Sequence, residues 1–382
     1  MTDVLICGAG IAGSTLAYWL VRAGLRPTVV ERAPGTRSSG NPVDVRGPAV
    51  PVAEAMGLMP GLRAAATAAT TVTLLAPSGR RIARMAAPAA RGRGGEVEIA
   101  RADLAAILYE AARPDAEFLF GDTITALHPD AAGVDVQFDR SPGRRFDLVV
   151  GADGLHSTVR RLAFGPERDH VHHLGLYVAT LPLGRPAERA DEVLLHNTPG
   201  RLASIHPARG EAIAAFIFRG PTLPDLDYRD TERHRRVVLD AYAGAGWEVP
   251  RLLDALRKAD DFYFDAVSAV RLDAWSRGRI ALVGDAASCV SLLGDGSSLA
   301  IAGAHTLADA LANHADVAEA LRVYEHRHRK LVAPKQRNIG FAAGMLVPKT
   351  RLGVGARNLA ARVMPGGRTG GRPGGRRSNQ AA

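Results

Sequence analysis

Cysteine and long apolar runs are scarce in this chain of 382 residues. The only cysteines, Cys7 and Cys289, cannot form a disulfide framework, and no Cys/His cluster offers a zinc site. The one long stretch without charge, Val4 to Val21, holds three glycines in a fixed pattern and lacks the basic residues that precede the apolar core of a signal peptide. We therefore expect a soluble protein of the reducing cytoplasm, with no metal site and no membrane partner.

Acidic residues are absent from the last part of the chain. The net charge is +9, and eight basic residues without an acidic one lie between Lys349 and Ala382. The rest of the chain is nearly neutral at +1, so the charge does not indicate a nucleic-acid-binding body. The segment GGRTGGRPGGRR could be an Arg/Gly RNA-binding tail or a solvated, disordered terminus; we favour the terminus and expect no nucleic-acid partner.

The composition, with 47% apolar and 23% charged residues, is that of an ordinary globular protein with room for two or three compact units. At the start of the chain, apolar runs and a helix alternate in the order typical of an open α/β sheet. The first unit is expected to contain strands at 4–7, 28–30, 134–138 and 146–150, helices at 11–22, 49–56 and 101–112, and a hairpin at 71–84.

A second unit is expected after residue 161. Short strands separated by Pro and Gly turns predict a mostly antiparallel sheet with strands at 174–183, 192–196, 202–206 and 212–218. Helices are expected at 230–243 and 250–258. The pattern of the first unit then returns with a buried strand at 280–283 and helices at about 298–311 and 316–329.

Gly8-Ala9-Gly10-Ile11-Ala12-Gly13 is a G-x-G-x-x-G turn between the first strand and the first helix. Gly8 allows the tight turn, Gly10 lets the backbone approach a pyrophosphate, and Gly13 lets helix and strand pack closely. The phosphates would lie at the helix N-terminus, where free N–H groups and the helix dipole favour negative charge. Glu31, at the end of the second strand, is placed to bind an adenosine ribose. The pattern predicts a dinucleotide, either NAD or FAD.

Two further loops follow buried strands. Asp153 lies in Gly151–Gly154, directly after strand 146–150. Asp285 follows strand 280–283, and Gly294-Asp295-Gly296 comes a short way on. Because open α/β sheets bind ligands at the carboxyl ends of their strands, we expect these loops and the glycine turn to form one site.

With these motifs the chain resembles the class A flavoprotein monooxygenases, the p-hydroxybenzoate hydroxylase-like group that includes tetracycline-modifying and polyketide-tailoring hydroxylases. The resemblance rests on GAGIAG, IARADL, GADGLHSTVR and WSRGRIALVGDAA, which stand in the family's order over about residues 1 to 330. It implies an α/β fold with a Rossmann-like (GR2-type) FAD-binding domain, an inserted, mostly antiparallel β-sheet substrate domain and C-terminal helices. The implied divisions are 1–70, 97–165 and 271–315 for FAD, 71–96 and 166–270 for substrate, 316–364 for the helices and 365–382 for a basic tail.

The resemblance also implies an activity. FAD would be the cofactor and the reactive group, with NADH or NADPH as a transient reductant. The enzyme would hydroxylate an aromatic or polyketide-like molecule through a C4a-hydroperoxyflavin, in secondary metabolism such as antibiotic biosynthesis. Its substrate would lie between the flavin and the second sheet. No separate nicotinamide fingerprint is present, so the choice between NADH and NADPH stays open.

The resemblance assigns most of the candidate residues to FAD. Those implied for its AMP half are Gly8, Gly10, Ala12, Gly13, Glu31 and, at the adenine rim, Arg32. Those implied for the ribityl and pyrophosphate groups are Arg101, Gly284 and Asp285, while Asp153 belongs to a motif linked with both FAD and the nicotinamide nucleotide. Near the flavin ring the implied residues are Arg46, Gly294, Gly296, Ser297 and Ser298, the last four at a helix N-terminus facing flavin N1.

Four of the polar residues have simpler alternatives. Arg101 could form an ordinary ion pair at its helix start, and Asp285 could cap the segment that follows. Arg46 could pair with Asp44, and Asp295 could be a helix N-cap that faces solvent.

The loop from Ser288 to Gly296 departs from the family pattern. Ser288 replaces a His, Leu292 replaces a Pro, and the loop is one residue shorter. Because this loop faces the reactive edge of the flavin in the family, an FAD-dependent reductase or another non-hydroxylating enzyme on the same fold remains the alternative. The clustered His170, His172 and His173 are not accompanied by a carboxylate motif, so they indicate no metal site.

Overall fold

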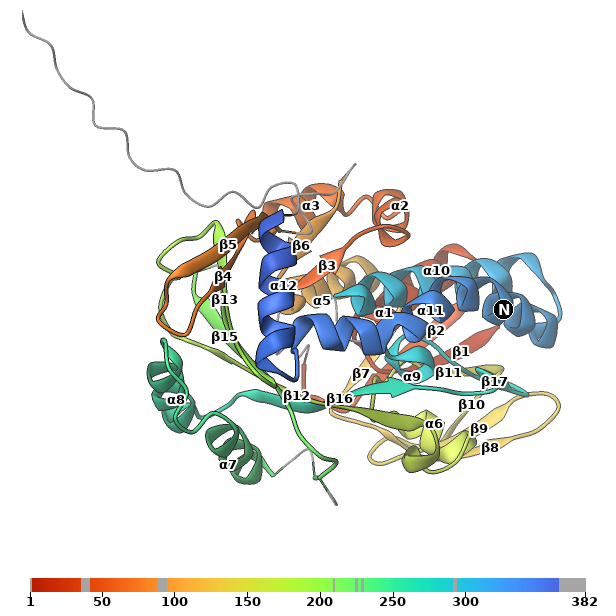
Figure 1. Ribbon diagram of the computed structural model, residues 1–382. Helices are drawn as coiled ribbons and strands as arrows, with labels where there is room; N and C mark the ends of the chain where they lie inside the picture. Colours follow the sequence, from red (N-terminus) through yellow and green to blue (C-terminus); the bar gives the residue numbers. More distant parts are fainter. Residues whose placement is uncertain are drawn as a thin grey trace, which may run out of the picture.

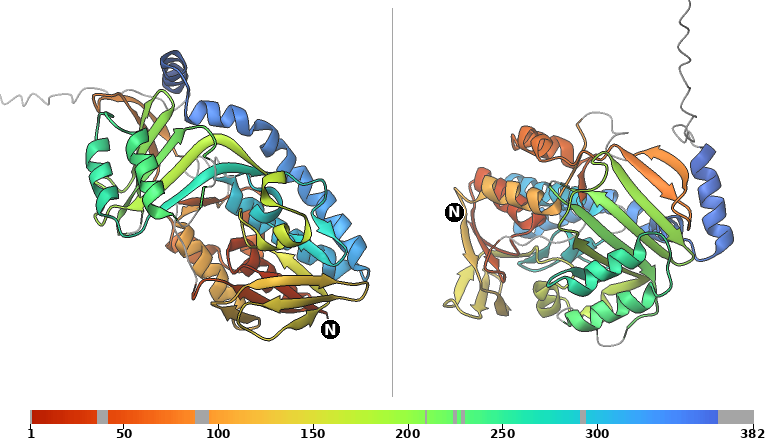
Figure 2. Two further views of the ribbon diagram at one scale, coloured as in Figure 1. Left: turned by 90° about the horizontal axis from the view of Figure 1, so that it is seen from below. Right: turned by 90° about the vertical axis from the view of Figure 1, so that its left-hand side faces the viewer.

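A computed structural model describes residues 2–35, 42–87, 95–208, 210–223, 226–227, 230–290 and 294–363. The chain builds two large sheets, with helices packed on both faces of each (Figures 1 and 2). The predicted α/β class with a second, mostly antiparallel sheet is confirmed. The tail expected at 365–382 and the substituted Leu292 lie outside the described residues.

A six-stranded sheet, ordered β17-β18-β11-β1-β2-β7, forms the centre of the first unit. Its strands are β1 (Asp3–Cys7), β2 (Arg26–Glu31), β7 (Glu117–Phe120), β11 (Leu148–Gly151), β17 (Ser276–Arg277) and β18 (Ile280–Leu282). All neighbours are parallel except β17 and β18, and the central strands are buried along almost their whole length. The loops after β1, β11 and β18 therefore leave the sheet at the same edge.

Helices α1 (Ile11–Arg22), α5 (Arg101–Ala112) and α10 (Asp295–Asn313) cover one face of this sheet (Figure 1). The other face carries α6 (Thr158–Ala163) and a three-stranded sheet (Figure 1). That small sheet consists of β8 (Ile124–Pro129), β9 (Val134–Phe138) and β10 (Arg144–Phe146). The remaining elements of this unit are β3 (Val43–Val45), β6 (Val97–Ile99), α2 (Ala49–Ala55), α3 (Met59–Ala64) and α9 (Asp285–Ser288).

The second large sheet has the order β16-β12-β15-β14-β13-β4-β5 and is antiparallel except between β13 and β4. Its strands are β4 (Thr71–Leu75), β5 (Arg81–Ala86), β12 (Val171–Pro182), β13 (Glu192–Thr198), β14 (Arg201–Pro207), β15 (Ala212–Arg219) and β16 (Tyr263–Val270). Its outer face, with Phe216 and Phe264, packs against α7 (Thr231–Ala241) and α8 (Val249–Lys258). Its inner face, with Leu176, packs against Val347, which directly follows the long helix α11 (Val317–Leu346).

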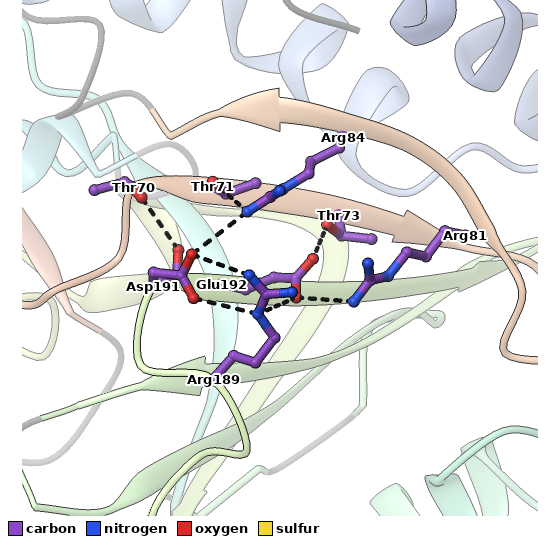
Figure 3. A network of polar contacts seen from close by, with 8 residues as sticks. All are labelled: Thr70, Thr71, Thr73, Arg81, Arg84, Arg189, Asp191 and Glu192. Carbon is purple, nitrogen blue, oxygen red and sulfur yellow. Dashed lines mark hydrogen bonds and ion pairs between the residues drawn. The ribbon is translucent and has the colours of Figure 1, made fainter. Parts of the chain in front are cut away.

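A polar network fastens the parallel pair β4–β13 (Figure 3). The buried Glu192 carboxylate accepts a hydrogen bond from the Thr73 hydroxyl. It also forms ion pairs of 3.3 Å with Arg81 and 3.2 Å with Arg189. Because a carboxylate is buried at reasonable cost only when it is paired and hydrogen-bonded, this network fixes the hairpin of β4 and β5 to the edge of the main sheet.

The C-terminal helices differ from their expected bounds. Helix α11 (Val317–Leu346) runs well past the expected end at 329, and α12 (Arg351–Val363) follows it. Pro334 lies inside α11, where proline removes a helix hydrogen bond. The buried side chains of Val332 and Ile339 offset that cost by packing on both sides of Pro334.

Two other expected boundaries were wrong. The strand expected at 146–150 is divided between β10 and β11, because Asp147 bonds to Asp3 through its backbone N–H (2.9 Å) and its carboxylate (2.7 Å). Phe146 consequently pairs with β9, and Leu148 pairs with β1. Helix α10 begins at Asp295 rather than at Ser298. Within the ranges that the structure describes, no helix is both long and apolar enough to span a bilayer.

Candidate functional site

The glycine turn after β1 packs against the loop after β11. Gly8 has a φ of +106°, and a Cβ there would lie 2.6 Å from the main-chain oxygen of Ala152. A Cβ on Gly13 would lie 1.8 Å from the oxygen of Gly8, so helix α1 sits too close to the turn for any side chain. Gly10, by contrast, is exposed at the start of α1, and a Cβ there would have no neighbour within 4 Å. The first two positions shape the turn, while Gly10 leaves open space in front of the helix.

Glu31 ends β2 beside this turn. Its carboxylate oxygens accept hydrogen bonds from the backbone N–H groups of Ala9 (3.0 Å) and Ala33 (2.9 Å). Each oxygen keeps a second lone pair, so the carboxylate can still accept hydrogen bonds from a ligand hydroxyl. Arg32 is exposed directly next to it.

Asp153 in the loop after β11 has a role that its motif did not reveal. Its carboxylate accepts hydrogen bonds from the Ser157 hydroxyl (2.5 Å) and from the N–H groups of Thr158 (2.7 Å) and Val159 (3.1 Å). It therefore caps the start of α6, together with Ser157. Burial raises the pKa of Asp153, although these hydrogen bonds oppose the shift.

The loop after β18 touches α1 and faces α10. Gly284 has a φ of +65°, and a Cβ there would lie 2.9 Å from the Cβ of Ala12. A Cβ on Gly296 would lie 3.8 Å from a carboxylate oxygen of Asp285. Asp285 is the first residue of α9, whose N-cap is Gly284, and α9 receives no side-chain cap hydrogen bond from the described residues. The capping alternative for Asp285 is therefore wrong.

A cluster of charges surrounds the start of α10. Asp295 pairs with Arg46 at 2.8 Å and with Lys335 at 3.0 Å, and Arg46 also pairs with Asp44 at 3.1 Å. The alternative of Asp295 as a solvent-facing N-cap is wrong, because Gly294 is the N-cap and the Asp295 side chain is only 15% exposed. The alternative pairing of Arg46 with Asp44 is confirmed.

Ser297 and Ser298 fasten α10 to β3. Both hydroxyls donate to the main-chain oxygen of Asp44, at 2.7 and 2.8 Å, and the Ser298 hydroxyl accepts from the N–H of Arg46 at 3.0 Å. Burial raises the pKa of Asp44, the Arg46 cation lowers it, and Asp295 raises it again. A Cβ on Gly294 (φ +77°) would lie 2.8 Å from the Asp44 carboxylate, so this junction also requires glycine.

Arg101 stands apart from these contacts. It is the first residue of α5, is exposed, and forms no hydrogen bond or ion pair with any residue that the structure describes. The alternative of an ordinary ion pair at the helix start is therefore not observed within the described ranges. The structure thus joins Gly8, Ala12, Asp285 and Arg46 to their neighbouring loops. Among the residues that it describes, none supplies an anion to the Arg101 cation.

Two residues of the GADGLHSTVR motif were missed as contributors to this region. The fully buried Arg160 donates to the main-chain oxygen of Ala286 at 3.1 Å. His156 lies between Glu167 (3.0 Å) and Asp265 (3.5 Å). Burial disfavours the imidazolium, but the two carboxylates outweigh it and raise the pKa of His156 to about 10. No pattern in the sequence distinguishes the buried Arg160 from the adjacent, exposed Arg161 in the short helix TVRRLA.

The clustered histidines are held by the protein itself. His170 bonds the oxygen of Phe164 at 3.1 Å, and His173 bonds Thr222 at 3.2 Å and the oxygen of Leu176 at 2.9 Å. Over the described ranges, no group of three or more His, Cys, Asp or Glu side chains could hold a metal ion.

Comparison with known proteins connects this arrangement to a family. A family model described as FAD binding domain matches residues 1–336. The chain is 42% identical over 317 residues to an uncharacterized protein of Mycobacterium tuberculosis, which covers 81% of this chain and 85% of that protein. It is 34% identical over 312 residues to a flavin-dependent monooxygenase of Legionella longbeachae, covering 81% and 80% respectively. The crystal structure of tetracycline destructase Tet(55) aligns with a TM-score of 0.82 at 32% identity, covering 94% of this chain and 95% of that one.

Proposed function

This chain belongs to the FAD-binding domain family and is an FAD-dependent oxidoreductase, and we propose that it is an NAD(P)H-dependent monooxygenase that hydroxylates an aromatic or polyketide-like small molecule. The observation that carries this function is its 34% identity, over four fifths of both chains, to a flavin-dependent monooxygenase. The likeness to a tetracycline destructase supports a polycyclic, oxygen-rich substrate. The comparisons do not favour the alternative of a non-hydroxylating reductase.

We propose that FAD lies where the loops after β1, β11 and β18 meet. Helices α1 and α10 begin with Gly10 and Gly294 as N-caps and receive no side-chain cap hydrogen bond from the described residues. Their first N–H groups are therefore available to a ligand, and the helix dipoles favour negative charge there. The open space in front of Gly10 supports a pyrophosphate at α1. The N-terminus of α10 suits the pyrimidine edge of a flavin.

The other assignments follow from this placement. Glu31 would accept hydrogen bonds from the adenosine ribose, with Arg32 at the adenine rim. Arg101, a cation without a protein anion in the described ranges, would bind a phosphate, and Asp285 would bind the ribityl hydroxyls. The proposed FAD-binding parts remain 1–70, 97–165 and 271–315, with the substrate parts at 71–96 and 166–270.

FAD, when bound, supplies the redox chemistry by accepting a hydride from the nicotinamide nucleotide and activating oxygen. The protein would bind and orient it, and would compensate the charge around it. An unpaired Asp295 at the start of α10 would repel negative charge on the cofactor. Its ion pairs with Arg46 and Lys335 neutralise this repulsion, so the N-terminus of α10 can still bind a negatively charged group.

Flavin content and oxygen labelling test the two parts of this function separately. We expect purified protein to be yellow, to bind FAD after reconstitution, and to oxidise NADH or NADPH faster with substrate than without. Tetracyclines and smaller polycyclic phenols form the first panel, and ¹⁸O₂ should label the product. Colourless protein that cannot be reconstituted would contradict the FAD site. Nucleotide oxidation that yields only hydrogen peroxide across the panel would contradict the monooxygenase assignment alone.

A further inference from the structure

Helix α12 presents its apolar side to solvent. Leu352, Leu359 and Val363 repeat at helical spacing on one face and are 87%, 62% and 78% exposed. On the opposite face, Arg357 donates a hydrogen bond of 2.9 Å to the side-chain oxygen of Asn197 on β13. A helix on the surface of a soluble protein normally shows the reverse arrangement, with its apolar stripe inward. The outward stripe therefore needs a partner.

The middle and the end of α11 continue this surface. Leu331, Phe341 and Met345 are 39%, 76% and 40% exposed. Together with the three residues of α12 they are the large apolar side chains that the described part of the chain leaves exposed, and no other element contributes one. We call these six residues the apolar strip. The second half of α11 and all of α12 lie on the same face of the molecule (Figures 1 and 2). Because these side chains are concentrated in two consecutive helices, the strip differs from the single apolar residues that are scattered over most protein surfaces.

The apolar strip lies in a segment of a single charge sign. From His326 to the end of the chain there are thirteen basic residues and no acidic one, so the rest of the chain carries a net charge of −4. Lys330, Arg337, Lys349 and Arg351 are exposed and form no ion pair with the described residues. The chain continues through residues 364–382 with four further arginines. The partner of this surface therefore has to be both apolar and anionic.

We propose that the apolar strip and the basic residues around it bind the surface of an anionic lipid bilayer. Acyl chains accept the leucine, phenylalanine and valine side chains, and acidic headgroups pair with the exposed cations. A second copy of the chain would bring two positive surfaces together, and RNA would offer phosphates but no apolar layer. The negative remainder of the protein would be repelled, so α11 and α12 face the bilayer. The expectation of no membrane partner rested on the lack of a spanning segment. Peripheral binding through this surface needs no such segment.

Vesicle flotation with the full-length protein tests this surface. We expect binding to vesicles of phosphatidylcholine mixed with phosphatidylglycerol, weak binding to phosphatidylcholine alone, and release at high salt. Replacing two outward leucines, in L352N/L359N, should weaken binding by at least about tenfold. Removing two cations, in K349Q/R351Q, should weaken it about 30-fold at low salt. The matched control R251Q/R257Q removes two exposed charges from α8, on the other side of the second sheet, and should change nothing.

Several outcomes would overturn the proposal. One is equal binding to neutral and anionic vesicles, or none to either; another is a loss in R251Q/R257Q as large as in K349Q/R351Q. A concentration-dependent dimer in light scattering that L352N/L359N abolishes would assign the strip to a second copy. RNA binding that survives L352N/L359N while vesicles do not bind would assign the cations to nucleic acid. Flotation involves no turnover, so its failure leaves the proposed oxidoreductase function untouched.

Discussion

The guanidinium of Arg160 donates a hydrogen bond of 3.1 Å to the main-chain oxygen of Ala286, which lies 126 residues further along the chain. Its other terminal nitrogen donates to the oxygen of Leu155. Ala286 belongs to α9, directly after β18, and Leu155 to the turn after β11. One fully buried cation therefore ties together two of the three strand ends that form the candidate site.

Replacing Arg160 by glutamine should destabilise both the fold and the cofactor site. The shorter, neutral side chain leaves buried carbonyl oxygens without a donor and removes the cation near Glu167, which is 3.6 Å away. We expect a loss of about 3 kcal/mol in the free energy of unfolding and less FAD per chain after purification. Arg161→Gln, at the exposed next position, is the control. Equal denaturation midpoints for the two variants would show that the Arg160–Ala286 bond does not hold the loops.

Substitutions at two glycines of the first turn should affect folding and cofactor binding separately. Gly13→Ala puts a methyl group 1.8 Å from the oxygen of Gly8, so we expect misfolding or a loss of several kcal/mol. Gly10→Ala meets nothing within 4 Å and should leave the melting temperature of the apoprotein unchanged. If a pyrophosphate approaches the backbone there, Gly10→Ala should weaken FAD binding at least about tenfold. Titration of apoprotein with FAD measures this, and unchanged affinity in Gly10→Ala would place the phosphates elsewhere.

Much of this fold is predictable from local patterns in the sequence. Helices 11–22 and 101–112 and strand 134–138 have the predicted bounds, because amphipathic or buried periodicity and glycine turns set them locally. The expected end of α11 at residue 329 was wrong because burial of Val332 and Ile339 outweighs Pro334. The division at Asp147 depends on Asp3, which is distant in the chain. Such long-range effects leave no periodic signal.

The loops that form the site were predicted from the sequence. The ion pairs that join these elements were not predicted. Motif spacing brings Gly8, Asp153 and Asp285 to one edge, because parallel strands end together. The pairing of Asp295 with Lys335 joins residues from α10 and α11, whose packing cannot be derived from either segment alone. Asp153 is the aspartate of the GADGLHSTVR motif. Its carboxylate nevertheless accepts hydrogen bonds from Ser157 and Thr158, so that it caps a helix.

The ion pairs of His156 should make stability fall at alkaline pH. Its pKa of about 10 in the folded protein exceeds the value of about 6.5 expected in the unfolded chain. The stabilisation is therefore complete below about pH 6.5 and disappears as the pH rises through about 10. We expect His156→Gln to lower the free energy of unfolding by about 2 kcal/mol at pH 6, after allowing for partial solvent screening, and by much less near pH 10. Urea unfolding across this range, with His128→Gln at an exposed position as control, measures the difference. A difference independent of pH would contradict the charged state of His156.

The buried His328, by contrast, should make stability fall at acidic pH. It lies between Trp275 and Tyr324, is 1% exposed, and neither ring nitrogen has a hydrogen-bond partner among the described residues. Burial lowers its pKa to about 4, so the unfolded chain binds the proton more tightly between about pH 6.5 and 4. Over that interval the protein should lose about 3 kcal/mol of stability as the pH falls.

The effect of His328→Leu on the free energy of unfolding should therefore change sign with pH. At pH 7 the leucine side chain, of similar volume but different shape, loses the ring packing against Trp275 and Tyr324, and we expect a destabilisation of about 1 kcal/mol. Near pH 4.5 the variant should be the more stable protein, because it has no buried base to protonate. Urea unfolding at both pH values checks this, with His326→Leu, exposed on the same helix, as the control. If the two curves never cross, protonation of His328 is not what limits stability in acid, and other groups would have to account for the loss.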